Sequence, residues 1–103
     1  MLELKKVAVS GTLESSDVQI VLEPNPGKGI QIDLESDVKL QFGDSILATV
    51  KKTLKQMDVE DAVVRINDKG AIDCTIVARL QTAVCRASGI RFDWNKEALN
   101  ASR

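Results

Sequence analysis

The fold is decided by the stretch VQIVLEPNPGKGIQIDL, residues 18–34. Residues 18–22 are rich in β-branched side chains, and residues 30–34 alternate apolar and polar positions, the period of two that marks a half-buried strand. Between them, residues 23–29 contain two prolines and two glycines, which predict a turn or exposed loop. With the short apolar run at residues 7–9, the stretch predicts an antiparallel meander of strands.

A helix is predicted after these strands, because apolar residues then recur at spacings of three and four. Its apolar stripe consists of Phe42, Ile46, Val50, Leu54 and Met57. The start of this helix has two interpretations. Ser36 or Asp37 could cap a long helix, or Asp44 could cap a shorter one after Gly43, with the preceding residues extended.

The last third of the chain predicts one more strand and one more helix. Residues 62–66 form a β-branched run, and the following NDKG, residues 67–70, is a strong turn signal. The second helix ends near Gly89, a residue type favoured at the C-cap. Its predicted apolar face consists of Ile76, Val77, Leu80, Ala83, Val84 and Ala87.

The predicted element order is therefore β-β-β-α-β-α. Strands in one block and two amphipathic helices predict an α+β fold, a two-layer sandwich in which two helices cover a mainly antiparallel sheet of about four strands. A length of 103 residues favours one domain. We assign that domain to residues 1–90 and expect residues 91–103 to form a loosely ordered tail, docked on the body by Phe92 or Trp94.

Composition argues against several classes of function. A net charge of -1 and an aromatic content of 3% disfavour a nucleic-acid binder, which needs a basic groove and stacking side chains. The chain has no histidine, and so it lacks the commonest general base and the commonest metal ligand. Residues 1–6 lack the apolar core of a signal peptide, and no apolar run is long enough to cross a bilayer. These features predict a cytoplasmic protein with no membrane or nucleic-acid partner.

The cysteines and a run of carboxylates give no clear metal signal. Cys74 and Cys85 lack zinc-site spacing, and on one straight helix they would be about 16 Å apart, too far for a disulfide. We interpret both as small core residues in a reducing compartment. Asp33, Glu35 and Asp37 alternate as a metal cluster on a strand would, but a solvated strand edge is the better interpretation.

A small polar connection, GTLESSD at residues 11–17, is predicted on the surface between the first two strands. Ser15 and Ser16 are thus expected to be exposed. A serine hydroxyl there can accept a phosphate-linked group from a transferase, and that chemistry needs accessibility and no base within this chain. By composition alone, however, they are simply serines in a turn.

Five segments together resemble the citrate lyase acyl carrier proteins, the gamma subunits. They are AVSGTLESSD (8–17), QFGD (41–44), NDKGAIDC (67–74), ARL (78–80) and RASGI (86–90). The resemblance covers nearly the whole chain in family order. It implies that Ser15 carries, through a phosphodiester, a prosthetic group derived from triphosphoribosyl-dephospho-coenzyme A. Ser16 is adjacent and chemically equivalent, and only alignment with Gly-Thr-Leu-Glu-Ser selects Ser15.

The resemblance further implies a carrier with no catalytic or metal-binding residues of its own. The thiol of the arm holds acetyl and citryl groups as thioesters, which are presented to an alpha subunit, the acyltransferase, and a beta subunit, the lyase. A prosthetic-group transferase and an acetylating ligase are further expected partners. Exposed lysines could contact the phosphate-rich arm or a partner, although a solvated face is the better interpretation, because exposed lysines usually have no other role. They are Lys5, Lys6, Lys51, Lys52 and Lys55.

Three other functions compete with this one. The acyl carrier of malonate decarboxylase resembles the same family, although the continuous Gly-Thr-Leu-Glu-Ser and the Asp-Cys after Gly-Ala favour citrate lyase. An unmodified regulatory or scaffolding α+β domain would make Ser15 and Ser16 replaceable. A stand-alone enzyme is the weakest hypothesis, because it would require turnover by the single chain.

Overall fold

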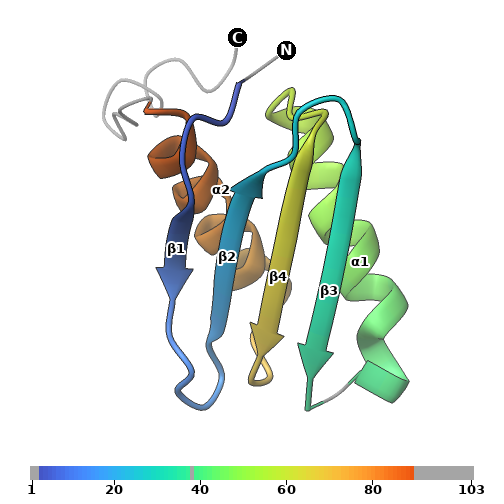
Figure 1. Cartoon of the computed structure of the whole chain (residues 1–103). Helices are drawn as coiled ribbons and strands as arrows, with labels where there is room; N and C mark the ends of the chain where they lie inside the picture. The colour runs from blue at the N-terminus through green and yellow to red at the C-terminus, as the bar shows by residue number, and fades with distance from the viewer. Residues whose placement is uncertain (1–2, 38, 90–103) are drawn as a thin grey trace, which may run out of the picture.

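A computed structural model of the chain describes residues 3–37 and 39–89. It contains a four-stranded sheet with both helices on one face (Figure 1). Its elements, in chain order, are β1 (Ala8–Gly11), β2 (Val18–Pro24), β3 (Ile30–Ser36), α1 (Lys39–Gln56), β4 (Ala62–Asp68) and α2 (Asp73–Ser88). The predicted element order and the two-layer α+β sandwich are confirmed.

The predicted meander is wrong in one respect, because β2 and β3 are not neighbours. The strand order is β1-β2-β4-β3, so that β4 lies between them. β4 is antiparallel to β2 and parallel to β3. A helix between two strands returns the chain to the end at which it started, and this crossover through α1 makes β3 and β4 parallel. The sheet remains mainly antiparallel, since two of its three pairings are of that kind.

The core lies between the sheet and the helices. In β2, alternate residues Val18, Ile20 and Leu22 are fully buried, as the period of two requires. Of the predicted helix faces, Val77 and Met57 are only half-buried, whereas most of the other residues are buried as predicted. These residues include Ile46, Val50 and Leu54 of α1, and Ile76, Leu80, Ala83, Val84 and Ala87 of α2.

The long form of α1 is confirmed, because the helix starts at Lys39 and Gly43 lies inside it. The predicted burial of Phe42 is wrong, since its side chain is 53% exposed. Phe42 lies in the first turn of α1, at the end of the sheet, where it borders an open pocket. Of the two cysteines, Cys85 is buried as expected but Cys74 is exposed, because it lies in the first turn of α2. Gly89 forms the left-handed C-cap of α2, at φ 78°.

The acidic run of β3 lies on an edge strand, as the edge interpretation predicts. Asp33 and Glu35 are exposed on β3, and β3 is the last strand of the sheet. Within residues 3–37 and 39–89, no group of three or more His, Cys, Asp or Glu residues is placed to hold a metal ion. Neither described helix is long and apolar enough to span a bilayer. The predicted tail, with Phe92 and Trp94, falls outside the described residues.

Candidate attachment site at the Ser15 turn

Ser15 occupies a tight turn in the connection between β1 and β2. The amide of Asp17 donates to the carbonyl oxygen of Glu14 at 3.1 Å, so Ser15 and Ser16 are the two central residues. Ser16 has φ 66° whereas the φ of Ser15 is not positive, the sign pattern of a type II turn. Both serines are exposed, as predicted.

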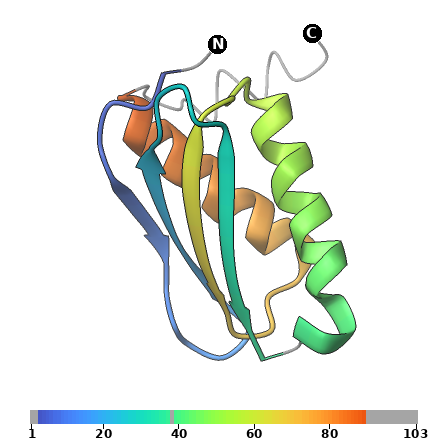
Figure 2. The same ribbon diagram turned by 45° about the vertical axis from the view of Figure 1, so that its right-hand side comes forward.

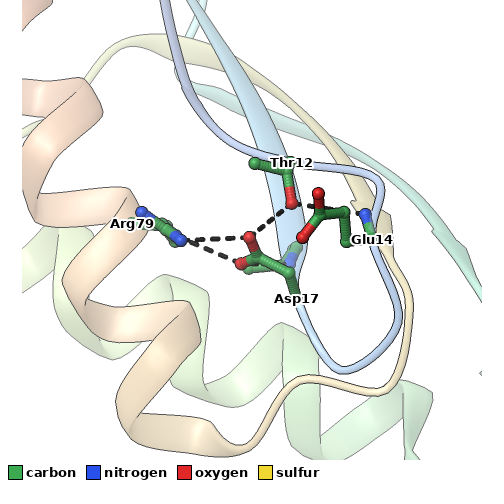
Figure 3. Close-up of polar contacts among 5 residues, drawn as sticks. Thr12, Glu14, Asp17 and Arg79 are labelled. Atoms are coloured by element: carbon green, nitrogen blue, oxygen red, sulfur yellow. Dashed lines mark hydrogen bonds and ion pairs between the residues drawn. The ribbon is translucent and has the colours of Figure 1, made fainter.

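Hydrogen bonds among the side chains of Thr12, Asp17 and Arg79 connect the turn to α2 (Figure 3). We call these three residues the Asp17 network. Thr12 Oγ1 donates to Asp17 Oδ2 at 2.6 Å, and the Glu14 amide donates to Thr12 Oγ1 at 3.2 Å. Arg79 of α2 donates from Nε and Nη2 to the two carboxylate oxygens at 3.1 and 3.0 Å. A two-pronged guanidinium–carboxylate pair restricts both distance and orientation, and so it ties the connection to α2.

The Asp17 carboxylate also accepts the amide of Val18 at 2.7 Å. The Thr12 hydroxyl, the Arg79 guanidinium and this amide all favour the ionised form, and they hold the pKa of Asp17 well below its usual range. The Asp17 side chain is only 15% exposed, whereas that of Arg79 is 41% exposed. The carboxylate is therefore a fixed negative group under the turn.

This depressed pKa makes a testable contribution to stability. Above about pH 5, Asp17 is ionised in the folded and unfolded chains alike, and its contacts contribute fully. At lower pH the unfolded chain gains a proton that the folded protein does not, so the contribution is lost toward the folded-state pKa. We expect Asp17→Asn to be less stable than the wild type at about pH 7. The gap between their free energies of unfolding should be smaller at about pH 3.

Urea denaturation of both proteins across this pH range measures the gap. Asp33→Asn is the matched control, because Asp33 is exposed on edge strand β3, and it should change stability by no more than about 0.5 kcal/mol. A gap for Asp17→Asn that stays constant or widens as the pH falls would contradict the assignment.

The loop between β4 and α2 supports the turn from a second side. The Ser16 amide donates to the Lys69 carbonyl oxygen at 2.7 Å, and the Lys69 amide donates to the Asp17 carbonyl oxygen at 2.9 Å. Next to Lys69, the fully buried Asp68 carboxylate accepts the Ala71 amide at 2.9 Å and the Ser36 hydroxyl at 2.8 Å. Asp68, the last residue of β4, therefore links the loop that holds the Ser15 turn to the end of β3.

These contacts place Lys69 and Arg79, and not the five lysines named in the sequence analysis, beside the Ser15 turn. Lys69 Nζ lies 3.8 Å from Asp37 Oδ1. The β1–β2 and β4–α2 connections meet at the end of the sheet where α1 begins, whereas α1 ends at the opposite end (Figure 2). The predicted lysines all lie toward that opposite end and are exposed: Lys51, Lys52 and Lys55 in the last half of α1, and Lys5 and Lys6 before β1.

Sequence reasoning identified Ser15 and Ser16 but missed the residues that support them. In the sequence, Arg79 lies outside the predicted apolar face of its helix, which consists of residues 76, 77, 80, 83, 84 and 87. That position was the one available signal, since an arginine at the border of a buried face commonly has a partner. Nothing local indicates that the partner is Asp17, because 62 positions separate the two residues.

Comparison with known proteins places the chain in a class of protein, the acyl carrier subunits. Residues 5–87 match the family described as the malonate decarboxylase delta subunit (MdcD). The crystal structure of a Pseudomonas malonate decarboxylase hetero-tetramer in complex with malonate contains a chain of the same fold. The TM-score is 0.66 with 24% sequence identity, over 82% of this chain and 87% of that one. At that identity, the likeness shows the fold alone.

Within that class, the chain belongs to the family of citrate lyase acyl carrier proteins. It is 52% identical to the citrate lyase acyl carrier protein of Clostridium perfringens, over 90% of this chain and 93% of that protein. It is 48% identical to that of Lacticaseibacillus casei, over 97% of both chains. The relative from Vibrio cholerae is 50% identical, over 86% of this chain and 92% of that protein.

Proposed function

We propose that this chain is the acyl carrier subunit of citrate lyase, and that Ser15 carries the prosthetic group derived from triphosphoribosyl-dephospho-coenzyme A. One observation supports the site assignment above all. Ser15 is exposed at the corner of a turn that is fixed by the Asp17 network and by backbone hydrogen bonds to the β4–α2 loop. The relatives support the carrier role, because they are named citrate lyase acyl carrier protein and match over most of their length.

The residues around Ser15 fit a large covalent group. All residues from Thr12 to Ser16 are exposed, so an arm attached there points into solvent and displaces nothing in the core. When bound, the arm supplies the terminal thiol that holds the acetyl or citryl group. This chain supplies a root for the arm that is fixed in position.

Ser15 fits the attachment better than Ser16. The backbone of Ser16 is in the left-handed region, and its amide is bonded to the β4–α2 loop. The backbone of Ser16 is therefore fixed against that loop. Ser15 precedes it at the corner, with ordinary backbone geometry and exposure.

A carrier of this kind acts by presentation and not by chemistry of its own. A tethered thioester meets each active site at a high effective concentration, provided that the root of the arm is accessible and docking is transient. We propose the alpha acyltransferase and beta lyase subunits as the sites that it visits, in the cytoplasm. The prosthetic-group transferase and an acetylating ligase load the arm.

The protein produced together with its transferase should gain the mass of the prosthetic group, and peptide fragmentation should place it on Ser15. The same chain produced without the transferase is the control and should have the unmodified mass. An adduct on another residue would refute the site, and no adduct with an active transferase would refute the carrier assignment.

Malonate decarboxylase is the second candidate, because the matched family is named for it and the fold is shared. Reconstitution separates the two complexes. We expect the loaded chain to support citrate cleavage with citrate lyase subunits and no malonate decarboxylation with malonate decarboxylase subunits. The opposite result would assign the chain to malonate decarboxylase.

A further inference from the structure

Large apolar side chains are exposed around the Ser15 turn. The described residues include five large exposed hydrophobic residues, and three of them are Leu13, Phe42 and Ile72, at 50%, 53% and 67% exposure. Leu13 lies in the β1–β2 connection, Phe42 in the first turn of α1, and Ile72 directly before α2. These three segments come together at one end of the fold (Figures 1 and 2).

A pocket of about 240 Å³ opens between α1 and the β4–α2 loop at this end. It is lined by Phe42, Ser45, Ile46, Gly70, Ala71 and Asp73. The loop that forms one wall continues from Lys69, which accepts the amide of Ser16. The pocket therefore lies beside the attachment turn and offers a concave apolar contact next to it.

Among the side chains that the structure describes, two unpaired carboxylates lie at this end. Glu14 and Asp73 are exposed, and neither has an ion-pair partner in residues 3–37 and 39–89. The positive groups of the Ser15 turn and its supporting loop, Lys69 and Arg79, are instead paired with Asp37 and Asp17. A partner thus meets apolar side chains bordered by carboxylates.

We propose that Leu13, Phe42, Ile72 and the adjoining pocket form the surface that docks on the citrate lyase subunits that receive the arm. The inference rests on the proposed function, because it takes Ser15 as the root of the arm. We call this surface the Ser15-end surface. Its occupant is an apolar patch on the partner that is bordered by lysine or arginine.

The chemistry of the arm argues for a basic partner. A phosphodiester-linked arm is anionic, so the entrance of an active site that admits it must present cations. Once the carrier docks, Glu14 and Asp73 lie around the root of the arm and face that entrance. Opposite charges across a docking surface speed encounter and orient the partners, while desolvated apolar side chains supply most of the affinity.

The experiment uses the arm-free Ser15→Ala protein, so that docking is measured apart from loading. Its dissociation constants for purified citrate lyase alpha and beta subunits are measured by calorimetry. In this background, Ile72→Ser and Phe42→Ser should each weaken binding to at least one subunit by about tenfold. Val9→Ser is the matched control, because Val9 is 46% exposed on β1 away from this end, and it should leave binding within about twofold.

The charge component has its own readout. Binding should weaken as salt increases, and Glu14→Gln with Asp73→Asn should flatten that dependence. Glu60→Gln is the control, since Glu60 is exposed at the opposite end of the sheet. Thermal denaturation of each variant verifies that its fold is intact.

The outcomes separate this inference from the proposed function. No binding by the arm-free protein, or equal effects of Ile72→Ser and Val9→Ser, would overturn the Ser15-end surface even if Ser15 is loaded normally. Docking that depends on Ile72 and Phe42 supports the surface. If Ser15 is then not loaded by the transferase, the attachment site fails while the surface stands.

Discussion

Replacing Ser15 with alanine is expected to abolish loading of the prosthetic group, and with it citrate cleavage by the reconstituted complex. No other substitution in the chain should have so large a functional effect with so little structural cost. The Ser15 side chain is exposed, so its loss should change stability by no more than about 0.5 kcal/mol. Intact mass after production with the transferase measures loading, and oxaloacetate release measures cleavage.

Ser16→Gly is the matched control for this prediction. It removes the neighbouring hydroxyl, but glycine adopts the positive φ of Ser16 without strain, so the turn is kept. We expect Ser16→Gly to be loaded fully and to support cleavage. Loading that survives in Ser15→Ala and disappears in Ser16→Gly would move the attachment to Ser16. If neither change affected cleavage and the intact mass showed no adduct, the result would favour the unmodified scaffold hypothesis.

Gly11→Ala is expected to produce the largest loss of stability among exposed or half-buried positions, about 3 kcal/mol. Gly11 ends β1 with φ 84°, a conformation that L-residues rarely adopt. An added Cβ would also overlap the carbonyl oxygen of Val18 and lie 2.9 Å from its carbonyl carbon and 3.3 Å from Arg79 Cδ. β1 would have to separate from β2, which would also displace the Asp17 network.

Gly27→Ala isolates the backbone part of this effect. Gly27 has a similar φ of 73°, but no atom lies within 4 Å of an added Cβ. Its cost should therefore be only the strain of the left-handed region, about 1 kcal/mol. Urea denaturation measures both variants. Equal losses for the two would show that the steric overlap at Gly11 relaxes at no cost, and would refute the close approach of β1 and β2.

Much of the fold could be predicted from the sequence, because the signals are local. The period of two in β2 and the apolar stripe of α2 depend only on which residues must be hidden from water. The C-cap at Gly89 and the turn after β4 depend on the conformational preferences of single residues. The exposure of Ser15 and Ser16 follows likewise from a short polar connection between two strands.

The predictions from sequence were wrong where contact with a distant segment determines strand pairing or burial. β2 and β3 were expected to pair because they are consecutive, but the α1 crossover places β4 between them. The periodicity of α1 predicts a buried Phe42, yet its burial depends on whether another element covers the first turn of the helix. Cys74 is exposed for the same reason, since its place at the start of α2 lies at the end of the layer.

The sequence by itself determined the element order, the α+β class, and an exposed serine turn in a histidine-free chain. Resemblance to a family then indicated which serine and which prosthetic group. Only the tertiary structure decided what holds that turn in place: Arg79 of α2 reaches Asp17 across 62 positions, and Lys69 accepts the amide of Ser16. The physical reason is that periodicity and turn preference act over a few residues, whereas an ion pair or a strand pairing requires two distant segments to be brought together by the burial of the core.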